Sequence, residues 1–233
     1  MFEQIPELST ILSVNTLSLL PVLSLLEVIL SADNAIALAA LTRGLQDVQL
    51  QRRALNFGLL MAYGLRILLI LVSTWVIQFW EFEVAGALYL LWLVFKYFSS
   101  DPDKSEDHHH HGPRFASIWQ AAPVIAMTDL AFSLDSVAAA VAVSRHIGVI
   151  LLGATIGIIA LRFMAGLFIR WLDEYTNLED AGYLTIALVA VHMLLRVAND
   201  ELVPPDWLML ILIGQLFVWG FAERTKPKAI FDK

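Results

Sequence analysis

Seven apolar segments, most of them near the length that crosses a lipid bilayer, constrain the fold of this chain more than any other feature. A helix needs about 20 apolar residues to cross the roughly 30 Å hydrocarbon core of a membrane. Apolar residues do not alternate with polar ones along these segments, so strands are not expected. The sequence therefore predicts an all-α membrane protein with seven transmembrane helices in a single membrane domain, residues 1–233. The predicted helices cover residues 17–42, 54–78, 84–98, 117–144, 147–172, 181–198 and 206–223.

The amino-acid composition agrees with a membrane location. Apolar residues make up 58% of the 233 residues and charged residues 16%, against roughly 45–50% and about 25% in soluble domains. This balance excludes a disordered chain, a nucleic-acid-binding protein and a conventional soluble enzyme. The chain has no cysteine, which excludes disulfides, thiolate metal sites and cysteine nucleophiles. No phosphate-binding loop motif points to coupling with ATP.

Lysine and arginine residues are divided unequally between the two sides of the predicted helices. Eleven lie on one side, and only Arg145 and Arg196 lie on the other. Cytoplasmic loops carry the excess of positive charge in membrane proteins, so we expect the N-terminus outside and the C-terminus in the cytoplasm. An odd number of spans also places the termini on opposite sides. The eleven are Arg43, Arg52, Arg53, Lys96, Lys104, Arg114, Arg170, Arg224, Lys226, Lys228 and Lys233.

The sequence contains an internal repeat. Residues 27–36 (EVILSADNAI) align with residues 129–138 (DLAFSLDSVA), and the similarity continues into the following helices. Each copy holds three spans, so the second copy is expected upside down relative to the first, as in many transporters. The predicted units are repeat one (about 17–98), a cytoplasmic linker (about 99–116), repeat two (about 117–198) and a seventh helix (about 206–223). The aligned pairs are Glu27 with Asp129, Ser31 with Ser133, Asp33 with Asp135, Asn34 with Ser136, Arg66 with Arg162, Glu83 with Glu179 and Gly86 with Gly182.

Four carboxylates lie inside the first and fourth predicted helices, at Glu27, Asp33, Asp129 and Asp135. An unpaired charge at the centre of a membrane helix costs on the order of 2.5–3.5 kcal/mol by insertion scales. Asp33 lies about 120° from Glu27 on an ideal helix, so the four groups converge most easily where helices one and four are broken at the midplane. Asp33 is then the expected N-cap of a half-helix over 34–41. The alternative is polar pairing between helices with a structural role only.

The side chains of these motifs favour a hard divalent cation. All candidate ligands are oxygen atoms, which suit Mg²⁺, Ca²⁺ and Mn²⁺. The four carboxylates together with Arg66 and Arg162 sum to −2, which one divalent cation neutralises; the alternative role of these arginines is a structural salt bridge. His192, in the sixth span, is either a hydrogen-bonded core residue or a proton-handling group. The predicted metal ligands are Glu27, Ser31, Asp33, Asn34, Asp129, Ser133, Asp135 and Ser136, where the serine hydroxyls alternatively bond to freed backbone groups.

The linker between the repeats carries a histidine tract, His108–His111, beside Asp103, Glu106 and Asp107. Tracts of this composition can bind transition metals. The tract is therefore expected either to collect metal weakly at the cytoplasmic face or to be a solvated linker.

The strings LEVILSADNAIALA and DLAFSLDSVAAA resemble the paired signatures of the TerC family of integral membrane proteins, within the wider group of lysine-exporter-like transporters. The family pattern is an acidic residue followed by Ser-x-Asp-Asn in the first copy and by Ser-x-Asp-Ser in the second, and both copies are intact here. The resemblance covers roughly residues 17–223. It implies a seven-helix inverted repeat and a role in metal-ion homeostasis, most often manganese export. It also implies a multi-pass location in a bacterial inner membrane, or alternatively a thylakoid membrane. Some relatives are linked to membrane-protein assembly instead.

The residues and the resemblance together predict a secondary transporter that exports a divalent cation, Mn²⁺ or alternatively Ca²⁺, in exchange for protons. Like charges raise one another's pKa, so an empty four-carboxylate site is expected to hold protons that an arriving cation displaces. The cation is a substrate, and no permanently bound cofactor, enzymatic activity or nucleic-acid partner is expected; the partners are the metal ion and the lipid bilayer. The competing hypotheses are a membrane-protein insertion factor and, more weakly, an intramembrane hydrolase with paired aspartates. The sequence makes no prediction of oligomeric state.

Overall fold

The computed structural model describes residues 31–45, 47–76, 78–99, 115–144, 146–199 and 203–224, together with positions 21, 25 and 28. Over this part of the chain the structure is helical, apart from short connections and an isolated bridge between Tyr175 and Arg224. The all-α prediction is confirmed for these residues. The helices are α3 (Ala32–Thr42), α4 (Val48–Val76), α5 (Trp80–Phe98), α6 (Ile118–Val143), α7 (Ile147–Glu174), α8 (Leu178–Ala198) and α9 (Asp206–Gly220).

Helices α4 to α9 coincide closely with the predicted segments, and the differences lie at their ends. Of the first predicted segment, 17–42, the structure describes mainly α3, over Ala32–Thr42. α4 begins at Val48, ahead of the predicted residue 54, because the helix continues through a polar turn that hydropathy does not detect. α5 begins at Trp80, ahead of residue 84, and carries Glu81 and Glu83 in its first turn, where carboxylates stabilise the positive end of a helix dipole.

Four of these helices, α4, α6, α7 and α8, are long and apolar enough to cross a membrane. The side chains that they turn outward are largely apolar, including Leu60, Leu68, Phe163 and Val191. An apolar outer surface is the pattern expected where helices face lipid rather than water. The chain is therefore an integral multi-pass membrane protein.

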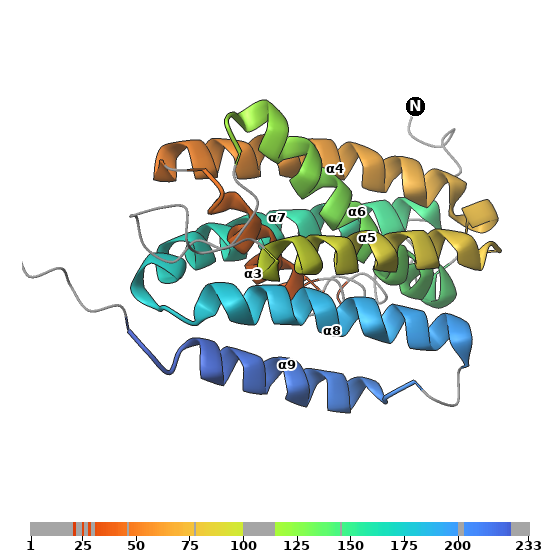
Figure 1. Cartoon of the computed structure of the whole chain (residues 1–233). Coiled ribbons are helices and arrows are strands. Elements are labelled where there is room, and N and C mark those ends of the chain that lie inside the picture. The colour runs from red at the N-terminus through yellow and green to blue at the C-terminus, as the bar shows by residue number, and fades with distance from the viewer. Residues whose placement is uncertain are drawn as a thin grey trace, which may run out of the picture.

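α3 lies at the centre of the bundle, and the longer helices surround it (Figure 1). Its residues from Ala35 to Leu41 are almost completely buried, because α3 contacts α4, α6, α7 and α8. α5, α8 and α9 run side by side, and α9 packs on the outer side of α8 (Figure 1). The most extensive helix contacts are those of α4 with α6 and of α5 with α8.

α6 is one continuous helix from Ile118 to Val143, so the predicted break in helix four is wrong. Its internal polar groups are satisfied without a break. The Thr128 hydroxyl donates to the Val124 carbonyl at 2.8 Å, and the Ser133 hydroxyl donates to the Asp129 carbonyl at 2.7 Å. Side-chain hydroxyls commonly bond to the carbonyl one turn earlier in this way, which leaves the helix intact.

α3 begins at Ala32, and Ser31 is its N-cap. Asp33 therefore lies inside the helix by its backbone, and the prediction that Asp33 is the N-cap is wrong by two positions. Whether helix one is interrupted before Ser31 remains a prediction, because most of the preceding residues lie outside the described part of the chain. The side chains of Glu27 and Asp33 and the tract His108–His111 also lie outside it.

Candidate functional site

One face of α6 carries the polar motif of the second repeat. Asp129, Ser133 and Ser136 are all buried, and their spacing of four and seven residues places them on one stripe of the helix. Asp135 lies about 120° away from Asp129 around an ideal helix, so it faces a different part of the bundle. The two carboxylates of α6 therefore have different neighbours.

Asp129 forms an ion pair with Arg66 of α4. The Arg66 Nη2 atom lies 3.2 Å from Oδ2 and 3.4 Å from Oδ1 of Asp129. The two side chains are only 1% and 0% exposed, and the Ser133 hydroxyl lies 3.4 Å from the Asp129 Oδ2 atom. The intramembrane arginine predicted from the repeat thus reaches a predicted ligand, and their opposite charges cancel inside the protein.

Asp135 forms an ion pair with Arg196 of α8. The two side chains are 33% and 32% exposed, in contrast to the Arg66–Asp129 pair. The Arg196 guanidinium also lies 3.1 Å from the Nε2 atom of His192, one turn earlier on α8. The predicted residues Asp135 and His192 are therefore linked through Arg196, which sequence reasoning had assigned only to the outer side of the membrane.

The remaining predicted residues occupy different places. Ser31 and Asn34 are buried at the start of α3, inside the bundle. Arg162 of α7 bonds instead to Asn56 of α4, in a groove also lined by Leu59, Tyr63 and Ile158. The structure does not bring Arg162 to Asp129 or Asp135, so the two arginines of the repeat have different environments.

Within the described residues, no three histidine, aspartate or glutamate side chains lie close enough to hold a metal ion together. Oxygen atoms of carboxylate, amide and hydroxyl groups suit hard divalent cations. The convergence of α3 and α6, which contact each other, makes these two helices the candidate source of ligands.

The sequence matches the family model described as the integral membrane protein TerC family over residues 12–227. This chain belongs to the TerC family. It is 36% identical to the uncharacterized membrane protein YceF of Bacillus subtilis over 176 residues, covering 73% of this chain and 68% of that relative. It is 30% identical to the uncharacterized membrane protein YkoY of Bacillus subtilis, covering 73% of this chain and 57% of the relative.

A further relative in the TerC group is the thylakoid membrane protein TERC of Arabidopsis thaliana, which is 26% identical over 201 residues, covering 73% of this chain and 52% of that protein. The chain thus spans between about half and two thirds of these relatives. No solved structure matches the sequence.

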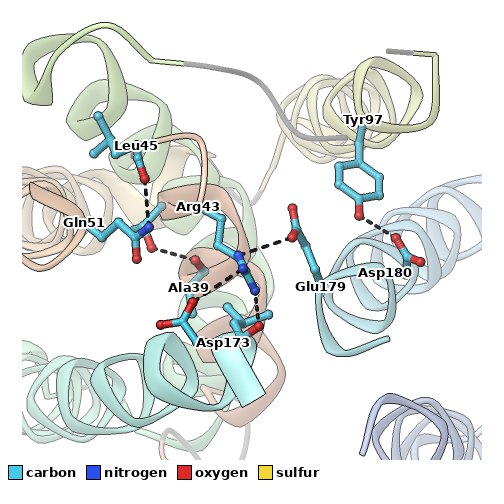
Figure 2. Close-up of polar contacts among 10 residues, drawn as sticks. Ala39, Arg43, Leu45, Gln51, Tyr97, Asp173, Glu179 and Asp180 are labelled. Carbon is cyan, nitrogen blue, oxygen red and sulfur yellow. Dashed lines mark hydrogen bonds and ion pairs between the residues drawn. The ribbon is translucent and has the colours of Figure 1, made fainter. Parts of the chain in front are cut away.

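A second polar cluster of this TerC protein joins α3 to α7 and α8, and Figure 2 shows its members around Arg43. Arg43, which follows α3, lies 3.4 Å from Glu179 of α8 and 3.5 Å from Asp173 of α7, measured between side-chain nitrogen and oxygen atoms. Its guanidinium also donates to the Leu172 carbonyl. Arg43 thereby connects the end of the central helix to the turn between α7 and α8.

Sequence reasoning used Arg43 only as a topology charge and noted Glu179 only as the repeat partner of Glu83. The signal that could have identified the cluster is that repeat, which places a glutamate in the first turn of both α5 and α8. Glu83 lines a small hollow together with Ser73 of α4 and Leu134 of α6. This hollow lies beside the α6 segment that carries Asp135.

Proposed function

We propose that this TerC-family protein is a secondary transporter that exports a divalent cation, Mn²⁺ in preference to Ca²⁺, in exchange for protons. The observation that carries the proposal is that Asp129 and Asp135 lie within an apolar helical bundle and are each neutralised by an arginine from another helix. Ionisable groups inside a membrane protein are expensive and commonly mark ion pathways. The motif that contains them occurs a second time in the chain.

The proposed ligands are Asp33 and Asp135, with Asn34 on the same central helix as Asp33. Glu27, Asp129 and the serines Ser31, Ser133 and Ser136 complete or flank this shell. The contact between α3 and α6 supports a shared site, because these helices carry the two copies of the motif. Of the two motif carboxylates on α6, Asp135 is partly exposed and Asp129 is enclosed, and an exchanging ion requires an accessible ligand.

The helix contacts support the proposal that the two halves form an inverted repeat. α4 packs on α6 as α7 packs on α3, and α5 packs on α6 as α8 packs on α3. In the repeat, α3 corresponds to α6, α4 to α7 and α5 to α8. The two contacts in each of these pairs are therefore equivalent, and each joins a helix of one half to a helix of the other half. Inverted repeats place substrate sites at the interface of the halves, and the contact of α3 with α6 is part of that interface.

We propose that proton coupling involves Glu27 and Asp33, because the arginine partners of Asp129 and Asp135 favour the ionised form of those two carboxylates. Neighbouring negative charges favour protonation of each other when no cation is present, so cation binding is expected to release protons from Glu27 and Asp33. The proposed orientation, with the N-terminus outside and the C-terminus in the cytoplasm of a bacterial inner membrane, makes the transport an export.

The test measures Mn²⁺ uptake into everted membrane vesicles energised by a proton gradient. Because ligand charge sets affinity at oxygen sites, Asp135→Asn and Asp33→Asn are each expected to lower the uptake rate at least about tenfold. Glu81→Gln is the matched control, because it removes the same charge from an exposed residue in the first turn of α5.

Protein abundance is measured in the same vesicles, and Ca²⁺ is compared as a second substrate. Full uptake by both aspartate variants at normal abundance contradicts the shared-site hypothesis. Equal loss of uptake in Glu81→Gln contradicts it as well, because the effect is then not specific to the site.

A further inference from the structure

The ion pairs Arg66–Asp129 and Arg196–Asp135 differ in one physical respect, the exposed fraction of their side chains. Arg66 and Asp129 are completely enclosed, whereas Arg196 and Asp135 are each about one third exposed. Removing one partner from an enclosed pair leaves a buried bare charge, which is strongly unfavourable. Partly exposed charges are screened, so an ion pair between them contributes little net free energy and separates at low cost. Only the Arg196–Asp135 pair can therefore open readily.

Arg196 also has alternative hydrogen-bond acceptors near it when it leaves Asp135. It lies in the last turn of α8, which ends at Ala198. The last carbonyl groups of a helix have no partner within the helix and attract cationic side chains. His192 Nε2, 3.1 Å from the Arg196 Nη2 atom, provides a further acceptor on the same helix face. The guanidinium can therefore swing away from Asp135 without losing all its hydrogen bonds.

We propose that Arg196 is a tethered counter-cation: it occupies Asp135 when the transported ion is absent, and a divalent cation displaces it. This inference rests on the proposed function, because it assumes that Asp135 is a ligand of the transported cation. Arg196 then acts as a specificity-determining residue and not only as a structural partner.

The proposed exchange discriminates by charge. A monovalent cation that replaces the guanidinium at Asp135 brings the same single charge, so it gains no Coulomb energy over the resident group. A divalent cation brings twice the charge to the same carboxylate and is favoured accordingly. Competition from Arg196 therefore lowers the affinity of Asp135 for every cation. Na⁺ and K⁺ then do not bind, whereas Mn²⁺ still binds, at reduced affinity.

The test measures Mn²⁺ binding to purified full-length protein in detergent by titration calorimetry, with and without added Na⁺. Removing the competing charge by Arg196→Gln is expected to tighten Mn²⁺ binding about tenfold or more. It is also expected to make binding sensitive to Na⁺ at about 100 mM, whereas the wild-type protein is insensitive. Arg196→Lys keeps the charge and is expected to behave as wild type in both measurements.

The matched control is Arg170→Gln, which removes an arginine from an exposed position near the end of α7 and is expected to leave both properties unchanged. Arg196→Met is the second variant, to be used if Arg196→Gln does not fold, because it keeps an unbranched side chain without the charge. Weaker or unchanged Mn²⁺ binding by a folded, uncharged variant overturns the counter-cation role, since a structural residue weakens binding when it is removed.

A parallel titration of Asp135→Asn separates this inference from the proposed function. If wild-type protein binds Mn²⁺ and Asp135→Asn does not, the site stands, and the result for Arg196→Gln decides the inference alone. If wild-type protein and Asp135→Asn bind Mn²⁺ equally, or neither binds it, both the site and the inference are overturned.

Discussion

Arg66 and Asp129 neutralise each other midway along α6, in an interior that solvent does not reach. The Arg66 Nη2 and Asp129 Oδ2 atoms are 3.2 Å apart, and the Ser133 hydroxyl lies 3.4 Å from the same carboxylate oxygen. Opposite charges in such surroundings depend on one another, because neither can be hydrated once its partner is lost. The pair therefore fixes α4 against α6.

This dependence predicts a specific pattern of stability changes. Arg66→Met and Asp129→Leu are each expected to destabilise the protein by about 3–5 kcal/mol, because each leaves a buried charge without a partner. The double variant removes both charges and is expected to be much closer to wild type. Thermal unfolding of the purified protein in detergent measures all four forms as a double-mutant cycle. Additive losses in the double variant would contradict the mutual dependence of the two charges.

At the level of single residues, sequence reasoning identified charged groups but not all their partners. The repeat singled out Arg66 and Asp129, and the salt bridge considered for Arg66 is observed, but the sequence did not indicate which carboxylate is its partner. Arg196 was missed as a partner of Asp135 because a charge near the end of an apolar segment is typical of a membrane boundary. Its long side chain reaches back into the bundle, which only the three-dimensional packing determines.

Among the helices, the contact of α4 with α6 depends on small residues. A Cβ atom built on Gly58 of α4 would lie 2.6 Å from the Ile125 Cγ2 atom and 2.7 Å from its Cβ atom. The Ala122 carbonyl oxygen is 3.2 Å away from the same point. Small residues allow membrane helices to approach closely, and this approach brings Arg66 within reach of Asp129.

Two glycines of α4 provide a matched test of this contact. Gly58→Ala is expected to destabilise the protein by about 1–3 kcal/mol, because the added methyl group overpacks the interface with Ile125. Gly64→Ala is the control, since a methyl group added there would meet no atom within 4 Å. It is expected to be neutral or to stabilise the helix by about 0.5–1 kcal/mol. Unfolding in detergent compares the two, and equal stability of the variants would contradict close packing at Gly58.

The ranges of α4 to α9 could be predicted closely because a membrane helix requires a long apolar segment, while their polar first turns could not. Whether helix four is interrupted could not be predicted, since the same polar residues are compatible with two arrangements. Asp129, Ser133 and Asp135 can line a broken helix, or they can be satisfied by Arg66, a backbone carbonyl and Arg196 within a continuous one. The second arrangement is observed, and it depends on contacts between helices that a local pattern does not contain.

At the scale of the whole molecule, successive helices run in alternating directions, so the loops between them lie at two opposite ends of the bundle. The end of α3 with Arg43, the start of α4 with Arg52 and the end of α7 with Arg170 belong to one end by chain order. The cluster of Arg43 with Asp173 and Glu179 closes that end between three helices (Figure 2). From the positive-inside rule we expect this arginine-rich end to face the cytoplasm.

The absence of cysteine from the sequence allows this orientation to be tested with single introduced thiols. Gln78, between α4 and α5, and Ser99, directly after α5, are exposed at opposite ends of α5. A membrane-impermeant maleimide added to intact cells is expected to label Gln78→Cys and not Ser99→Cys, because the positive-inside rule places Ser99 in the cytoplasm. In everted vesicles the labelling is expected to reverse, and the unmodified chain is the unlabelled control. Labelling of Ser99→Cys alone in intact cells would invert the orientation, and with it the direction of the proposed transport.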